Sequence, residues 1–172
     1  MQIMNSLEME KTLADLAGQL LEKHGDCQNL ALIGIQRRGV YLAARLAALL
    51  QARLKREIPQ GVLDINLYRD DWTMRGPGAV VGQTRLFFEV EGMDLLLVDD
   101  VLFTGRTIRA ALEALVDFGR PRKVELLALI DRGHRELPIQ ADYVGKTIDT
   151  KHDDHVDVLV SELDGHDEVL IN

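Results

Sequence analysis

The amino-acid sequence predicts an α/β fold in which helices flank a central parallel sheet. Aliphatic runs suited to buried strands occur at 29–35, 95–98 and 124–130. Helical patterns of apolar residues alternate with these runs, which is typical of doubly wound domains. Polar residues follow the strand candidates, and ligands of such sheets bind beyond the carboxyl ends of their strands. We therefore expect a ligand site at that edge.

The first half of the chain predicts two helices and two strands. Met9, Leu13, Leu16 and Leu20 recur at helical spacing, and Asn5 with Glu8 resembles a capping box, so the first helix should end near Gly25. The run 29–35 (NLALIGI) then predicts a strand. The alanine-rich stretch 39–53 predicts a helix that packs closely on the sheet, and 62–67 alternates in part, as a further strand would.

The second half predicts strands at 95–98 and 124–130, separated by a helix over about 107–118. Gly119 and Pro121 end that helix. Near the C-terminus, the extended runs 156–160 and 168–171 flank Asp164-Gly165, which favours a tight hairpin. We expect this β-hairpin at the sheet's edge or on an accessory lobe.

Bulk properties narrow the function classes. The 172 residues, 47% of them hydrophobic, suggest one domain spanning residues 1–172. No stretch suits a membrane span or a secretory signal, and the one cysteine, Cys27, fits a reducing compartment, so we expect a cytoplasmic protein. The net charge of −8 disfavours whole-chain attraction to nucleic acid or anionic lipid, although a local basic patch could still bind either.

The stretch LLLVDDVLFTGRTIRAAL, residues 95–112, carries the chemistry. Thr104, Gly105 and Thr107 precede a helix, whose unpaired backbone N–H groups and positive dipole end suit a phosphate monoester. Asp99 and Asp100 would repel phosphate, so we expect them to face sugar hydroxyls. The alternative, that the two acids cap the helix, is disfavoured by the TGRT that follows. The sequence contains neither a Walker loop nor a GxGxxG loop. The predicted ligand is a phosphorylated sugar.

This stretch resembles the 5-phosphoribosyl-1-pyrophosphate (PRPP) signature of type I phosphoribosyltransferases. Together with IGIQRRGVYLAARLA, DINLYRDD and IDRGHRELPIQADYVGK, it resembles the PyrR family of bacterial pyrimidine-operon regulators that also have uracil phosphoribosyltransferase activity. The resemblance covers nearly the whole chain apart from a shorter N-terminus. It implies a type I phosphoribosyltransferase fold with a flap at about 69–85 and a small hood contributed by 131–172.

The resemblance implies a reaction that joins uracil N1 to C1 of PRPP and gives UMP and pyrophosphate, with Mg²⁺ bound alongside PRPP near Asp99 and Asp100. These acids, which would hold the ribose hydroxyls, and Arg38, on the pyrophosphate, form the expected catalytic set. The residues expected to bind PRPP are Arg37, Arg38, Gly39, Arg69, Asp99, Asp100, Val101, Leu102, Phe103, Thr104, Gly105, Arg106 and Thr107. The uracil pocket should be bordered by Ile130, Asp131 and Arg132.

Two residues of the expected PRPP site depart from the family pattern. Arg37 stands where relatives often have threonine, and adds charge near the leaving group. Phe103 stands where tyrosine is common, a change that backbone binding of phosphate should survive.

The segment HDDH at 152–155 contains residue types that often bind metals, but a solvated loop is the preferred interpretation. Cys27 is interpreted as a packing residue.

The family's second activity is UMP-dependent binding of pyrimidine-operon messenger RNA. His134, Arg135 and Lys146 match positions on the family's RNA face. On the first helix, the residues are Ala14, Asp15 and Gly18 where RNA-binding relatives have threonine, arginine and histidine, which predicts weakened binding to a leader RNA.

Regulation of pyrimidine genes is the leading second role, and a homodimer or higher homo-oligomer is expected by resemblance only. The alternatives are a UMP-responsive RNA-binding attenuator with little catalytic role, and a phosphoribosyltransferase for a purine or orotate.

Overall fold

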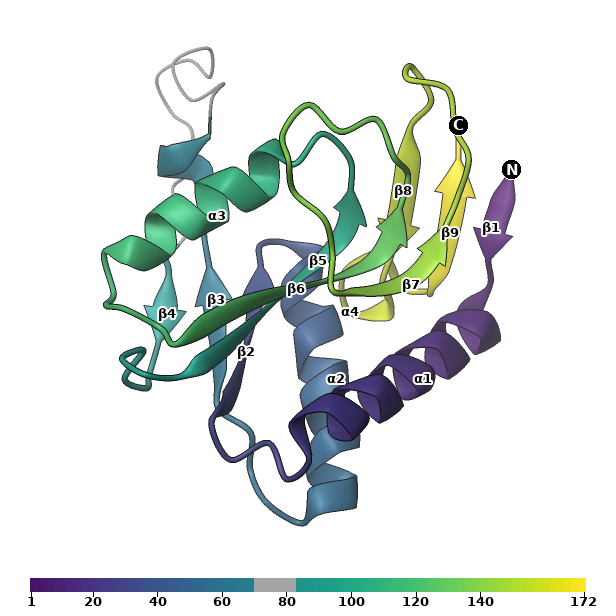
Figure 1. Cartoon of the computed structure of the whole chain (residues 1–172). Coiled ribbons are helices and arrows are strands. Elements are labelled where there is room, and N and C mark those ends of the chain that lie inside the picture. The colour runs from purple at the N-terminus through teal and green to yellow at the C-terminus, as the bar shows by residue number, and fades with distance from the viewer. Residues whose placement is uncertain (70–82) are drawn as a thin grey trace.

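The computed structural model describes residues 1–69 and 83–172 as helices around two sheets (Figure 1). The larger sheet in this part of the chain has the strand order β4-β3-β2-β5-β6-β7. Its strands are β2 (Leu30–Ile35), β3 (Gln60–Leu63), β4 (Arg85–Leu86), β5 (Asp94–Leu102), β6 (Lys123–Asp131) and β7 (Tyr143–Thr147). Neighbouring strands are parallel except β3 and β4, which pair antiparallel at one edge. The predicted central parallel sheet is confirmed.

Helices cover both faces of this sheet, as strands buried on both sides require (Figure 1). Helices α1 (Ser6–His24) and α2 (Arg38–Leu54) pack on one face, and α3 (Arg106–Val116) packs on the other. Along β2, Leu32 contributes to the core under α1 and α2, and its neighbour Ile33 to the core under α3. This period of two explains why the strand sequences are aliphatic at nearly every position.

The predicted capping box begins the first helix. The Asn5 side chain accepts a hydrogen bond from the Glu8 backbone at 3.0 Å, and the Glu8 carboxylate accepts one from the Asn5 backbone at 2.8 Å. Two amides that would otherwise lack acceptors are satisfied in this way. The helix ends at His24 before Gly25, as predicted.

Both ends of the chain build the second sheet. Strand β1 (Gln2–Met4) pairs antiparallel with β9 (Glu168–Ile171), which pairs with β8 (Val156–Leu159). The predicted C-terminal β-hairpin is confirmed, because β8 and β9 pair antiparallel, but the prediction of a tight turn between them was wrong. A short helix, α4 (Ser161–Asp164), lies in the connection, and Gly165 ends it with a φ of 79°.

Other boundaries also differ from the prediction. Strand β5 continues past Val98 through both acids to Leu102, because β6 pairs with it along its whole length. The strand predicted at 62–67 ends at Leu63, and a single 3₁₀ turn, η1 (Asn66–Tyr68), follows. Strands β1, β4 and β7 were not predicted.

The expected flap at about 69–85 lies mostly outside the described residues, which omit 70–82. Among the helices that are described, none has the length and apolar character needed to cross a membrane.

Candidate active site

A pocket of about 330 Å³ lies at the carboxyl end of β5. It is lined by Arg69, Asp99 and residues 101–108. Most of the predicted PRPP residues therefore share one cavity, at the edge of the sheet where ligands of α/β folds bind. Asp100, Arg37, Arg38 and Gly39 are not among its lining residues.

The loop between β5 and α3 forms the floor of this pocket. Gly105 precedes the helix with a φ of 93°, a backbone conformation that side chains disfavour. The Arg106 amide donates to the Thr104 hydroxyl at 3.3 Å, which tightens the turn. The first amides of α3 consequently face the pocket side, where a helix N-terminus favours an anion.

The two acids have different surroundings although they are adjacent in sequence. Asp99 is 6% exposed and lines the pocket, whereas Asp100 is half-buried and, one step along the strand, points to the other side. The Asp99 carboxylate accepts a hydrogen bond from the Asp100 amide at 3.0 Å. Burial, together with the neighbouring Asp100 charge, raises the pKa of Asp99 well above its usual value. A ligand that donates hydrogen bonds to Asp99 would relieve this cost.

The Gln36–Gly39 turn, which follows β2, packs directly against β5. A Cβ added at Gly39 would lie 2.3 Å from the Val98 carbonyl oxygen, and one added at Gly34 would lie 2.4 Å from Val40 Cα. Only glycine permits these approaches. The turn is thereby held beside Asp99, and its Gln36–Arg37 peptide bond is cis.

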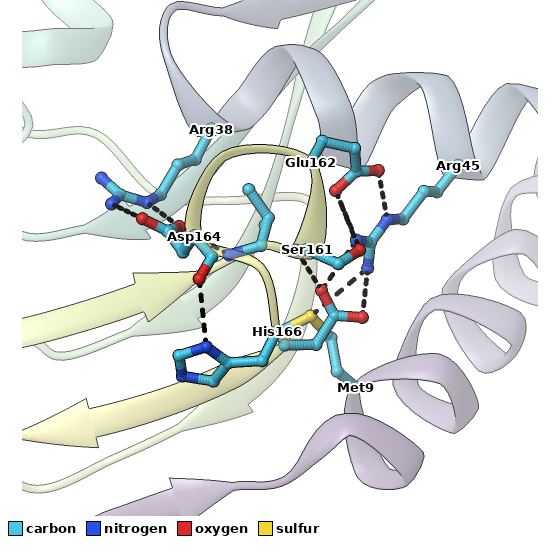
Figure 2. A network of polar contacts seen from close by, with 9 residues as sticks. Met9, Arg38, Arg45, Ser161, Glu162, Asp164 and His166 are labelled. Atoms are coloured by element: carbon cyan, nitrogen blue, oxygen red, sulfur yellow. Dashed lines mark hydrogen bonds and ion pairs between the residues drawn. The ribbon is translucent and has the colours of Figure 1, made fainter.

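The two arginines of this turn do different things. Arg37 is exposed, and lines a cavity of about 250 Å³ together with Gln36, Val40, Tyr41 and Leu163. The Arg38 guanidinium instead pairs with Asp164 of α4, with Nη2 3.0 Å from Oδ1 (Figure 2). The turn therefore contacts the C-terminal segment, which the sequence did not indicate.

The predicted uracil residues lie apart from the first pocket. Asp131 and Arg132 line a larger cavity of about 710 Å³, whereas Ile130 is fully buried in the sheet. Arg132 is 5% exposed, and its guanidinium donates to the backbone carbonyls of Lys151, His152 and Asp154. It also lies 4.0 Å above the centre of the Phe103 ring. Arg132 thus joins the loop at 151–154 to the floor of the first pocket.

The residues predicted for the RNA face have intramolecular partners. Arg135 donates to the carbonyls of Phe103 and Ile139, and its guanidinium is 2.5 Å from the Asp131 carboxylate. His134 bonds the Thr150 carbonyl at 2.7 Å, and Lys146 donates to the Ile3 carbonyl at 2.9 Å. Arg135 therefore mainly stabilises the fold through intramolecular contacts.

On α1, Asp15 is exposed, and Ala14 and Gly18 are half-buried. Asp15 places a negative charge on this side of the helix, and the Arg53 guanidinium, 3.5 Å from the Ala14 carbonyl oxygen, places a positive charge beside it. Weakened RNA binding stays a prediction.

Sequence reasoning missed a polar network between α2 and the C-terminal segment. Arg45 donates to Ser161, Glu162 and Asp167, at distances between 2.6 and 2.9 Å (Figure 2). These partners lie more than 110 positions from Arg45, so no local pattern links them. Among the described residues, no group of histidine, cysteine and acidic side chains could hold a metal ion. The segment 152–155 is among the residues searched, and it forms no such group.

Comparison with known proteins identifies the family. The model of the phosphoribosyl transferase domain matches residues 1–162. The bifunctional protein PyrR of Syntrophobacter fumaroxidans is 50% identical over 169 residues, which cover 98% of this chain and 91% of that relative. The bifunctional protein PyrR of Thermus thermophilus is 49% identical over 168 residues, covering 98% and 93%.

The chain belongs to the PyrR family. Solved structures agree with the type I phosphoribosyltransferase fold expected for a PyrR protein. The hypoxanthine phosphoribosyltransferase of Trypanosoma cruzi superposes with a TM-score of 0.73 at 15% identity, covering 99% of this chain and 94% of that one. The Staphylococcus aureus hypoxanthine phosphoribosyltransferase gives 0.66 at 22% identity, covering 88% and 79%. At these identities the likeness shows the fold alone.

Proposed function

We propose that this PyrR-family chain is a uracil phosphoribosyltransferase that converts uracil and PRPP to UMP and pyrophosphate. The observation that carries the proposal is the first pocket, in which a buried acid and a helix N-terminus face one cavity. A helix N-terminus binds the 5′-phosphate, and carboxylates accept hydrogen bonds from the ribose hydroxyls. Membership of the PyrR family selects the pyrimidine among possible bases.

In this mechanism, the chain's own residues bind and orient PRPP and stabilise charge. Asp99 and Asp100 bind the ribose hydroxyls, residues 101–107 bind the 5′-phosphate, and Arg38 receives the pyrophosphate as its bond to C1 breaks. Fixed cationic and amide donors stabilise the departing charge without reorganising. Arg69, which lines the pocket, is placed to contact the donor from the start of the flap.

Carboxylate oxygen is the ligand type that Mg²⁺ prefers, so Asp99, which lines this pocket, fits a PRPP-bound Mg²⁺. When bound, the ion would neutralise pyrophosphate charge. Its place beside PRPP, near Asp99 and Asp100, is part of the proposal.

The uracil contacts are proposed for Ile130, Asp131 and Arg132. Ile130 is covered by the sheet, so it would act through its backbone or through its packing. The buried Arg132 would act through Phe103 and the loop at 151–154, which it holds in place.

The decisive experiment combines an activity assay with a binding measurement. Purified chain with uracil, PRPP and Mg²⁺ should form UMP, and neither purine bases nor orotate should compete. The double variant Asp99→Asn plus Asp100→Asn should lose PRPP binding in calorimetry, because the neutral amides no longer accept both ribose hydroxyls. Unchanged affinity in a folded double variant would refute the assigned role of the acids.

A second function, UMP-responsive binding of pyrimidine-operon leader RNA, is favoured by the word "bifunctional" in the names of the relatives. His134, Arg135 and Lys146 are the proposed RNA contacts, and Asp15 weakens the interaction. A gel shift with and without UMP tests this function. Salt-sensitive RNA binding without UMP formation would make attenuation the principal activity.

We also propose that the chain forms a homodimer or larger homo-oligomer. Leu112 and Val116, one turn apart on α3, are 38% and 74% exposed, which suits an apolar contact. Light scattering during size-exclusion chromatography measures the assembly directly, and a monomer at all concentrations would exclude it.

A further inference from the structure

The pair between Arg38 and Asp164 joins the proposed pyrophosphate site to the C-terminal segment. Arg38 Nε lies 3.3 Å from Asp164 Oδ2, and Nη2 lies 3.0 Å from Oδ1. The carboxylate therefore accepts two hydrogen bonds from one edge of the guanidinium (Figure 2). Both side chains are partly buried, with 32% and 20% exposed. A two-point contact of this kind restricts the orientation of the planar group.

The acceptor is itself held in place. Asp164 Oδ2 also accepts a hydrogen bond from the Val160 amide at 2.8 Å, which ties the carboxylate to its own turn. The turn is then anchored to α2 by Arg45, which binds Glu162 on α4 and Asp167 after it. Asp164 therefore presents its oxygens to Arg38 from a supported position.

The far edge of Arg38 is directed away from Asp164. The contacts with Asp164 use Nε and Nη2, and Figure 2 shows the remaining nitrogen pointing away from the carboxylate. Within residues 1–69 and 83–172, Nη1 has no hydrogen-bond acceptor. A guanidinium has five N–H donors, so a carboxylate on one edge leaves the other edge able to bind a second oxyanion.

We propose that Asp164 is a positioning residue for the reaction, which orients Arg38 to receive the pyrophosphate of PRPP. The inference rests on the proposed function, since it assigns Arg38 to the leaving group. A neighbouring side chain supports it: Leu163 of α4 lines the same cavity as Gln36 and Arg37 of the turn. The small C-terminal sheet thereby completes the leaving-group side of the active site.

The test is the variant Asp164→Asn, measured in both directions of the reaction. An amide presents an NH₂ group to the guanidinium and loses one of the two contacts, so Arg38 is no longer held. We expect the KM for pyrophosphate in the reverse reaction, and for PRPP in the forward one, to rise about tenfold. The dissociation constant of UMP should stay unchanged, because UMP carries no pyrophosphate.

Two further variants test whether Asp164 affects pyrophosphate binding through its carboxylate and through Arg38. Asp164→Glu keeps the carboxylate and should recover part of the lost affinity for pyrophosphate. In a chain that already carries Arg38→Gln, adding Asp164→Asn should cause no further loss, because Asp164 acts through Arg38. The matched control is Asp157→Asn, which removes a charge from β8, where the carboxylate contacts Asn172 and neither Arg38 nor Arg45, and it should leave both KM values unchanged.

Three results would overturn the proposal. A lower KM for pyrophosphate in Asp164→Asn would mean that Asp164 competes with pyrophosphate for Arg38. An equal weakening of UMP binding would mean that Asp164 only supports the fold, and unchanged kinetics would mean that it has no role. A failure of the proposed function is separate, because it would appear as no UMP formation by the unsubstituted chain.

Discussion

At the scale of single residues, the geometry of the site depends on two glycines, whose lack of a Cβ atom allows close packing. Gly39 lets the start of α2 approach the Val98 carbonyl, and Gly34 lets β2 approach Val40. The backbone of the proposed pyrophosphate turn can therefore lie beside Asp99. In the sequence, only the family resemblance marked Gly39, and nothing marked Gly34. The need for glycine at 39 comes from its packing against β5, a segment far away in the sequence.

The substitution Gly39→Ala should cost both stability and PRPP binding. Its Cβ would lie 2.3 Å from a carbonyl oxygen of β5, so the turn or the strand must move. We expect the free energy of unfolding to fall by about 1–3 kcal/mol, as in other overpacked sites. Urea unfolding and calorimetry with PRPP measure the two effects.

A matched control for this prediction is Gly18→Ala in the interior of α1, where the nearest atom to an added Cβ is a flexible Arg53 nitrogen at 3.7 Å. This change should raise stability by about 0.5–1 kcal/mol, because glycine is a poor helix former. A Gly39→Ala chain as stable as the unsubstituted one would contradict the packing argument.

At the scale of secondary structure, sequence periodicity predicted the elements whose stabilising contacts are local. The capping box at Asn5 and the continuous aliphatic run of β2 are both visible within a few residues. Strand β7 was missed because YVGKT is half exposed and has no aliphatic run. The extension of β5 through Asp99 and Asp100 comes from pairing with β6, which local polarity conceals.

In the candidate site, too, the local features were predicted from the sequence and the long-range contacts were not. The two acids, Gly105 and the loop around it were predicted from one contiguous stretch, and Asp99, Gly105 and the loop share a pocket whose lining does not include Asp100. The Arg38–Asp164 contact was not predicted, since 126 positions separate its members. Tertiary ion pairs of this kind carry no sequence period.

The Arg45 network predicts how the C-terminal segment responds to pH. Hydrogen bonds from Arg45 lower the pKa of both Glu162 and Asp167. Their contribution to stability is therefore present above the unfolded-state values of about 4 and is lost as the pH falls through the lower folded-state values.

Arg45→Leu should reduce the free energy of unfolding at pH 7 by about 1–2 kcal/mol, a moderate figure because Glu162 is partly exposed. The difference from the unsubstituted chain should shrink below about pH 4. Denaturant unfolding at several pH values measures it, and hydrogen exchange should show β8 and β9 losing protection first. A difference that is independent of pH would exclude the ion pairs as its cause.

At the scale of the whole molecule, charge sets the limits on RNA binding. The net charge of −8 opposes approach to a polyanion, so any RNA contact must come from a local basic surface. The residues expected on that surface are partly used within the fold, as Arg135 and Lys146 show. Asp15 adds an exposed negative charge on α1.

Asp15→Arg should therefore strengthen UMP-dependent binding of the leader RNA. One more phosphate contact should steepen the dependence of log K on log salt by about 0.7–0.9. Filter binding at several salt concentrations measures the slope. The control, Glu113→Arg, makes the same charge change on α3, which covers the opposite face of the sheet. An equal gain in both variants would show that the effect is not specific to α1.

The sheet that unites both ends of the chain has a consequence for how the protein is made. Because β1 pairs with β9, strand β1 has no partner strand until β9, far later in the chain, has been synthesised (Figure 1). The β5–α3 loop can be complete before α4 is synthesised, whereas Arg38 can contact Asp164 only after α4 has left the ribosome. A nascent chain stalled before residue 161 would thus contain the proposed phosphate-binding loop, while Arg38 would still lack Asp164 as its partner.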